Sequence, residues 1–275
     1  MILMLILAEN RGYFYNMINK DSDITIFGTG KVAHQLGSEL KRKGNHINAV
    51  YGRNEQKAKK LSKKLKTKHI TSATKIPSNS LVIICISDSA IPKVVASLDK
   101  NLKVAYTSGS IRLEDLPDRP YLGVFYPLQT FSINKLVDFS SIPFLIESRS
   151  ELFEKELKSL ASSVSNYVKC ANSEDRYNLH IGAVMVNNFS NYLYHLAQKH
   201  LDEHDLDFKL LLPLIKETTE KLEILSPIEA QTGPAARGDK KIIQKHLNSI
   251  SDPKTKALYA LFSELIPKEI KKHEL

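Results

Sequence analysis

The sequence predicts an α/β fold in which a doubly wound parallel sheet is followed by an all-α C-terminal domain. Apolar runs of strand length alternate with helical segments up to residue 171, and this alternation is typical of parallel sheets. After residue 171 the strand-like runs stop. The length of 275 residues is near twice that of a common domain. We therefore expect a sheet domain over residues 17–171 and a helical domain over residues 172–275.

Strands are expected where apolar residues cluster between turn-forming residues. The runs at 141–148 and 166–171 are expected at the sheet edge, where they flank a helix expected over 151–163. The runs are DITIF (23–27), HINAVY (46–51), TKHIT (67–71), SLVIICIS (80–87), LKVAYTS (102–108), YLGVFYP (121–127), SIPFLIES (141–148) and NYVKCA (166–171).

The stretch ITIFGTGKVA, residues 24–33, is a strand that runs into a glycine turn and a helix. Gly28 allows the tight turn, Gly30 lets backbone N–H groups approach a pyrophosphate, and Ala33 is the small residue where helix packs on strand. The pattern is typical of a Rossmann-like dinucleotide fold, in which the phosphates lie at the helix N-terminus. The predicted phosphate-binding residues are Gly28, Thr29, Gly30, Lys31 and Val32.

The end of the second expected strand indicates which dinucleotide is bound. An NAD site places an acidic residue there for the ribose 2′-hydroxyl, but NAVYGRN (48–54) contains none. Arg53 suits the 2′-phosphate of NADP, and Asn54 supports the same assignment. The alternative is an ordinary solvated arginine that opens a helix.

Polar side chains follow three further strands. They are Ser87 and Asp88, then Ser108 and Gly109, then Tyr126 and Gln129. Ligands of doubly wound sheets bind outside the carboxyl ends of the strands, so these residues are expected to face ribose, nicotinamide or substrate. The alternative is simple turn chemistry, which favours Ser, Asp and Gly as well.

Residues 177–198 contain no Asp, Glu, Lys or Arg, which predicts a buried helix. They are too polar to span a membrane. At 100° per residue, His180, Val184, Asn187 and Asn191 share one stripe, with Asn188 at its edge. These polar groups need hydrogen-bond partners, which a ligand, a neighbouring helix or a dimer partner would supply.

The loop SPIEAQTGPAARGD, 226–239, is rich in turn residues. It could close over a site, with Thr232 and Gly233 beside Arg237 and the arginine facing an anionic substrate. Alternatively it is a plain connection between helices, with Asp239 capping the next one.

Composition bounds the remaining possibilities. The net charge of +9 comes mostly from lysines, and aromatic residues do not alternate with these lysines along the sequence. We therefore expect no nucleic-acid partner. Cys85 and Cys170 predict neither a disulfide framework nor a metal site, which fits the cytoplasm. The opening MILMLILA lacks the flanks of a targeting segment and is too short to span a bilayer. Met17 is a plausible start, which would make residues 1–16 a non-native or disordered extension.

Five segments resemble a bacterial family of Rossmann-like oxidoreductases whose C-terminal half is a domain of unknown function. The segments are IFGTGKVA, the SGS at 108–110, GVFYPLQTFS (123–132), EDRYNLHIGAVMVNNFSNYLY (174–194) and LSPIEAQTGPAARGD (225–239). The family is similar to deazaflavin-dependent NADP reductases, pyrroline-5-carboxylate reductase and the 6-phosphogluconate dehydrogenase superfamily. The resemblance implies a helical domain that dimerises and closes the active site.

Two positions depart from the superfamily pattern. Val184 stands four residues before Asn188, where better-characterised dehydrogenases use a lysine, and Tyr106 and Tyr126 stand where many relatives carry histidine. His180 is therefore the expected proton donor.

We expect a homodimeric NADP(H)-dependent oxidoreductase that reduces a carbonyl or imine in a small anionic substrate. Asn188 would hydrogen-bond the reacting oxygen or the carboxamide, and Tyr126, Gln129, Asn187 and Arg237 would contact substrate. The alternative is a protein that binds NADP without turnover, which Val184 favours. The sequence is also compatible with a deazaflavin as a second cofactor.

Overall fold

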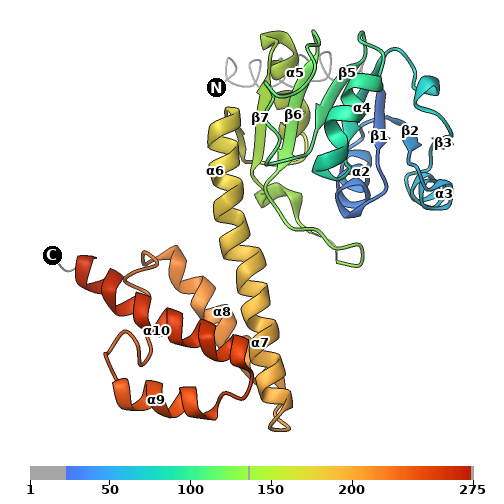
Figure 1. Cartoon of the computed structure of the whole chain (residues 1–275). Helices are drawn as coiled ribbons and strands as arrows, with labels where there is room; N and C mark the ends of the chain where they lie inside the picture. The colour runs from blue at the N-terminus through green and yellow to red at the C-terminus, as the bar shows by residue number, and fades with distance from the viewer. Residues whose placement is uncertain (1–22, 136, 274–275) are drawn as a thin grey trace, which may run out of the picture. The chain divides into compact units, whose positions relative to one another are not determined.

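The computed structural model describes residues 23–135 and 137–273 (Figure 1). The extension expected at 1–16 and the start expected at Met17 lie outside these residues. Contacts between residues divide the chain into two compact units, with the division between Asn187 and Asn188. The first unit holds the sheet and the second is helical.

Within the described residues, the sheet has eight strands in the order β3-β2-β1-β4-β5-β6-β7-β8 (Figure 1). All eight expected strands are present, and the doubly wound α/β fold is confirmed. The strands are β1 (Asp23–Phe27), β2 (Ile47–Tyr51), β3 (Lys68–Ile70), β4 (Ser80–Ile84), β5 (Lys103–Tyr106), β6 (Leu122–Pro127), β7 (Phe144–Ser148) and β8 (Val168–Cys170).

Helices cover both faces of the sheet because side chains alternate along each strand. In β1, Ile26 faces a core formed with three helices, whereas Phe27 faces the opposite core with one. The first three are α2 (Lys31–Arg42), α3 (Glu55–Lys64) and α5 (Glu151–Ser162), and the other is α4 (Ile91–Ser97). Each core excludes water from one face of the central strands.

One strand breaks the expected parallel pattern. β7 pairs antiparallel with β6, with Val124 opposite Glu147 and Tyr126 opposite Leu145. The all-parallel prediction is therefore wrong at this pair. Between β6 and β7 the described residues, 128–135 and 137–143, contain no α-helix, whereas the right-handed crossover of a parallel pair is usually helical.

The order of the strands places the glycine turn at the centre of the sheet. β1 lies between β2 and β4, so the strand order runs in opposite directions on the two sides of β1. This switch point is where doubly wound sheets bind ligands, at the carboxyl ends of their strands.

After β8 the described chain is helical or loop, as predicted. The helices are α6 (Ser173–Ala183), α7 (Ser190–Asp202), α8 (Leu212–Glu220), α9 (Lys240–Ser249) and α10 (Pro253–His273). Helix α6 belongs to the first unit. A π-helical segment, Val184–Phe189, follows it directly and contains the division between the units.

The uncharged run 177–198 is not buried in the single chain, contrary to prediction. Of these residues only Leu196 is buried, whereas Met185, Val186 and Phe189 are 55%, 76% and 59% exposed. Most of this apolar face is left exposed among the described residues. Exposed apolar side chains in such a row are typical of an interaction surface.

His34 is a buried titratable side chain of helix α2. Its Nδ1 atom has no hydrogen-bond partner among the described residues. Burial lowers the pKa of the imidazole, and the nearby charges of Lys64 and Lys60 lower it further. The folded protein therefore favours the neutral ring.

The fold should lose stability when His34 is forced to accept a proton. A histidine whose folded pKa is below the unfolded value stabilises the fold above about pH 6.5, and this contribution is lost as the pH falls below that value. His34→Gln should weaken the acid dependence of the free energy of unfolding, measured in urea between neutral and mildly acidic pH. His204→Gln, a change at an exposed ring, is the control. If the acid dependence of the free energy of unfolding is unchanged in His34→Gln, other titratable groups cause that dependence.

Candidate dinucleotide and proton-transfer site

The turn after β1 requires its first glycine for steric reasons. Gly28 has a φ of 134°, and a Cβ atom there would lie 2.1 Å from the Cys85 carbonyl oxygen at the end of β4. The backbone N–H of Gly28 donates to the carbonyl of Tyr51, and the N–H of Cys85 donates to the carbonyl of Phe27. The turn is thereby held against the ends of β2 and β4.

The second glycine opens the helix N-terminus. Gly30 is the N-cap of α2 and provides no side-chain cap, and a Cβ atom built on it meets nothing within 4 Å. Lys31 is exposed beside it, whereas Val32 packs against the core. Uncapped N–H groups at the end of a helix of 12 residues, beside open space, fit the phosphates of a dinucleotide.

The residues after β2 lie next to this turn. A Cβ atom on Gly52 would lie 2.5 Å from the Thr29 side chain, so the two loops touch. Arg53 follows directly and is exposed. Asn54 caps α3 by accepting the N–H of Lys57 at 2.9 Å, so its side-chain oxygen has a structural role. Arg53 is thus the cation of this pair of loops.

The loops after β4 and β5 are joined by hydrogen bonds. The Ser110 hydroxyl donates to the Asp88 carboxylate at 2.6 Å, and Ser108 accepts the N–H groups of Ser110 and Ile111. Ser108 and Gly109 are buried, whereas Ser87 is exposed. The predicted residues of these loops therefore meet at the carboxyl edge of the sheet.

Tyr126 at the end of β6 and His180 on α6 form the central contact of the site. The Tyr126 hydroxyl lies 3.2 Å from His180 Nδ1, with the rings nearly perpendicular at 72°. Burial raises the pKa of Tyr126, and the negative charge of Asp88 adds to this effect. The phenol therefore keeps its proton over the physiological range.

Gly109 makes room for this pair. A Cβ atom on Gly109 would lie 2.8 Å from both Tyr126 Cζ and His180 Nδ1. Any other residue would push the two rings apart, because such distances are not found for real Cβ atoms. The loop after β5 thus sets the geometry of a contact between two other elements.

Arg176 anchors α6 to the sheet. Its guanidinium is fully buried and forms an ion pair with Glu147 of β7. It also donates to the carbonyl of Ile111, to the Ser173 hydroxyl and to the hydroxyl of Tyr106. Arg176 and His180 are four residues apart and lie on the same side of the helix. The anchor therefore positions His180.

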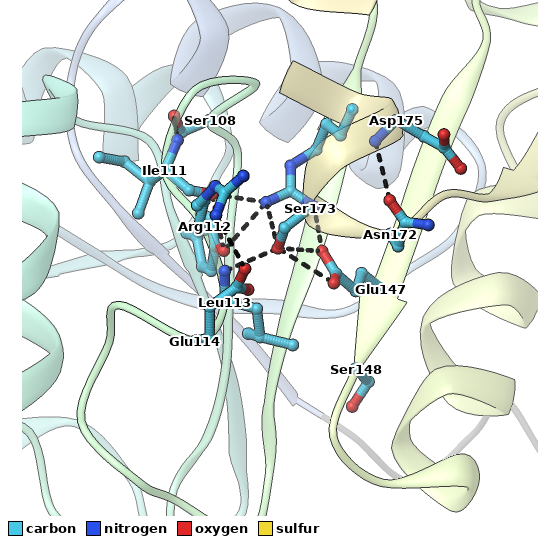
Figure 2. A network of polar contacts seen from close by, with 12 residues as sticks. Ser108, Ile111, Arg112, Leu113, Glu114, Glu147, Ser148, Asn172, Ser173 and Asp175 are labelled. Atoms are coloured by element: carbon cyan, nitrogen blue, oxygen red, sulfur yellow. Dashed lines mark hydrogen bonds and ion pairs between the residues drawn. The ribbon is translucent and has the colours of Figure 1, made fainter. Parts of the chain in front are cut away.

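The start of α6 also holds the loop after β5. The Ser173 hydroxyl lies 3.1 Å from the Glu147 carboxylate and accepts the N–H of Leu113 at 2.9 Å (Figure 2). Burial raises the pKa of Tyr106 well above its usual value. Tyr106 is therefore a neutral hydrogen-bonding group of this anchor.

A second buried arginine holds the other end of that loop. Arg119 is 3% exposed and donates to four carbonyl groups around the end of α4, those of Val95, Leu98, Asp99 and Leu102. These carbonyls include the orphan acceptors of a helix C-terminus. Arg119 thus fastens the segment before β6 to α4.

The π-helical segment changes the predicted stripe of polar residues. The stripe assumed 100° per residue, but a π turn accommodates an additional residue and rotates everything beyond it. The prediction that His180, Val184, Asn187 and Asn191 share one straight stripe is therefore wrong. Asn187 and Asn188 are both exposed, and the boundary between the two units falls between them.

The predicted loop residues of the second unit line a cavity of about 440 Å³. Asp239 caps α9 by accepting the N–H of Ile242 at 3.1 Å. The cavity brings Arg237 together with Thr232 and Gly233. The remaining lining residues are Ile228, Glu229, Gln231, Ala236 and Ile270.

Other predicted features are placed as follows. Gln129 is exposed and accepts the N–H of Thr130 through Oε1 at 2.8 Å. Within the part of the chain that the structure describes, no cluster of His, Cys, Asp and Glu could hold a metal ion. In the same residues, no helix has the length and apolar character needed to cross a membrane.

Comparison with known proteins defines the class. Residues 23–105 match the model of coenzyme F420-dependent NADP oxidoreductases, and residues 142–266 match domain of unknown function 2520. The first match spans the sheet from β1 into β5, and the second spans β7, α5, β8 and most of the helical segment after them. No match was found among the curated proteins.

A solved structure identifies the family. A Bacteroides fragilis protein with the provisional description NADP oxidoreductase is 38% identical and has a TM-score of 0.84, over 91% of this chain and 99% of that one. The chain belongs to the same family, which confirms the resemblance that the sequence showed.

More distant structures share the fold. A reductive aminase from Aspergillus terreus, solved with NADPH and ethyl-5-oxohexanoate, is 14% identical with a TM-score of 0.63, over 92% of this chain and 95% of that one. 1-Pyrroline-5-carboxylate reductase from Streptococcus pyogenes is 15% identical with a TM-score of 0.57, over 91% of this chain and 97% of that one.

Sequence reasoning missed the anchor of α6. Glu147 is the charged residue of the mostly apolar strand β7, and Arg176 is the last charge before the uncharged run. A charge in each of these positions is costly unless it is paired, and this was the available signal.

Removing one member of the buried pair should be strongly destabilising. Arg176→Met leaves the Glu147 carboxylate without its cation and should lower the free energy of unfolding by about 3–5 kcal/mol, measured by urea denaturation. The double variant Arg176→Met with Glu147→Met should recover much of this loss. Lys268→Met removes the exposed pair with Glu264 and should cost at most about 1 kcal/mol. Equal effects of the two single variants would contradict a special role for Arg176.

Proposed function

We propose that this protein is an NADP(H)-dependent oxidoreductase that reduces a carbonyl or imine group of a small anionic substrate. The observation that carries the proposal is the uncapped N-terminus of α2 at Gly30, beside open space and one residue after the strand-to-helix turn. Family membership and the fold shared with NADPH-binding enzymes support it.

The residues present fit the cofactor. Gly28, Thr29, Gly30 and Lys31 would hold the pyrophosphate at the helix N-terminus. Arg53 would pair with the 2′-phosphate, since a guanidinium fork matches its oxygens. When bound, NADPH supplies the hydride, and the loops that carry Asp88 and Ser108 would orient the nicotinamide end.

The proton that completes the reduction would come from the Tyr126–His180 pair. Both side chains lie at the same edge of the sheet as Asp88 and Ser108, and they are in contact with one another. Asn187 and Asn188 would hydrogen-bond the substrate or the carboxamide. Arg237, with Thr232 and Gly233, would bind an anionic group in the cavity of the second unit.

NADPH should bind more tightly than NADH, and Arg53 should carry the difference. Arg53→Ala should lose about 1–3 kcal/mol of binding free energy for NADPH and little for NADH, measured by calorimetry. Arg42→Ala, at the opposite end of α2, should change neither affinity. Consumption of NADPH with 1-pyrroline-5-carboxylate as an anionic imine probe tests turnover. Equal affinity of the unmodified protein for both cofactors would contradict the assignment.

A deazaflavin is a second candidate partner in hydride transfer, favoured by the family matched over residues 23–105. Oxidised coenzyme F420 added with NADPH, or reduced coenzyme F420 added with NADP+, would then change its absorbance as hydride passes between the two. An unchanged absorbance would remove this candidate.

We also propose that two copies of the chain associate through the exposed apolar residues of the segment 177–198. Val186→Asp should shift the dimer toward the monomer, because a charge in a buried interface is costly, and light scattering at micromolar concentration measures the change. Leu152→Asp is the matched control, because Leu152 is 75% exposed, like Val186 at 76%, but lies on α5. A monomeric unmodified protein would contradict the proposal.

A further inference from the structure

We propose that Tyr126, and not His180, hands the proton to the reduced substrate, and that His180 is the positioning residue that holds and reloads the phenol. This inference rests on the proposed function above. It assigns distinct roles to two side chains whose contact is observed.

The positions of the two groups favour Tyr126 as the donor. Tyr126 extends from the carboxyl end of β6, next to the end of β5 and one strand further from the end of β4, where the nicotinamide would lie. Its phenol interacts electrostatically with Asp88, which follows β4. His180 comes from α6, and its Nδ1 atom is occupied by the Tyr126 hydroxyl.

The direction of the hydrogen bond depends on the protonation state of the imidazole. When the imidazole is neutral and carries its proton on Nε2, the Tyr126 O–H donates to Nδ1. When the imidazole is protonated on both nitrogens, Nδ1–H donates to the phenol oxygen, and the phenolic proton becomes available to another acceptor. One change of protonation thus switches Tyr126 from storing its proton to offering it.

The step balances without a further reactant. As the hydride reaches the substrate carbon, the substrate oxygen or nitrogen takes the Tyr126 proton. The phenol oxygen takes the Nδ1 proton of the imidazolium, and the imidazole becomes neutral with its remaining proton on Nε2. Water later returns a proton to the ring. Burial favours the neutral phenol, so the phenolate does not persist.

The surrounding charges are Asp88 on the segment after β4 and Arg176 on the helix of His180. Asp88 raises the pKa of Tyr126 and Arg176 lowers it. Arg176 is committed to Glu147 in an ion pair, so its charge is partly balanced. Gly109 affects the contact through sterics alone, because a Cβ atom there would clash with both rings. A substitution at Gly109 therefore breaks the pair without altering either ring.

The test uses protein labelled with ¹⁵N-histidine, with the His180 signals assigned by their absence in His180→Asn. At about pH 9, where histidine is ordinarily neutral, the ¹⁵N shifts should show His180 in one tautomer with Nδ1 as acceptor. Tyr126→Phe removes the donor and should give a mixture of tautomers. Gly109→Ala should do the same, because its methyl group separates the rings.

Gly182→Ala is the control, since a Cβ atom there meets nothing within 4 Å and the residue lies on the same helix as His180. It should leave the tautomer unchanged. Melting temperatures verify that each variant is folded. An unchanged His180 tautomer in folded Tyr126→Phe would overturn the proposal.

Fluorescence titration with NADPH separates this inference from the proposed function. Binding should be the same in Tyr126→Phe as in the unmodified protein, and absence of binding in the unmodified protein would refute the function but not the pair. If 1-pyrroline-5-carboxylate is reduced, Tyr126→Phe should lower kcat by about 10²–10⁴, the usual contribution of acid catalysis. His180→Asn keeps a polar group near the Nδ1 position and should lower kcat less. The reverse ranking would overturn the assignment, and if the probe is not reduced the tautomer measurement alone decides.

Discussion

The buried ion pair between Arg176 and Glu147 is the interaction on which the arrangement of the site depends. It joins the first turns of α6 to β7, and through Tyr106 and the carbonyl of Ile111 it reaches β5 and the loop after it. The two terminal nitrogens of the guanidinium donate to several elements at once, whereas its buried Nε has no hydrogen-bond partner among the described residues. The pair therefore contributes mainly by specifying one orientation of α6, and hence one position of His180.

The local features of the fold could be predicted because each depends on residues that are contiguous in the sequence. The eight strands and the turn at Gly28 each produce a pattern within ten residues or fewer. The antiparallel direction of β7 and the partner of Arg176 could not, because both depend on residues that are distant in sequence. The π turn at 184–189 was also missed, since a periodicity analysis assumes a constant angle per residue.

The candidate site was predictable in its parts but not in its central contact. Tyr126 and His180 were each expected to face a ligand, one from a strand end and the other from a helix stripe. Their hydrogen bond spans 54 positions in the sequence, and the glycine that permits it belongs to a third element. Asn54 was predicted to support cofactor binding, but its side chain caps a helix. The residue type could not distinguish the two roles, because an asparagine that suits a phosphate equally suits a helix cap.

The two buried arginines have a consequence for the thermodynamics of ligand binding. Arg119 and Arg176 fasten the segment between β5 and β6 near its two ends, and Ser108 closes its first turn. A segment that is already ordered loses little conformational entropy when a ligand settles on it. Binding at Ser108 and Gly109 would therefore show a heat-capacity change set by the apolar surface removed from water, without the larger contribution that accompanies the folding of a loop.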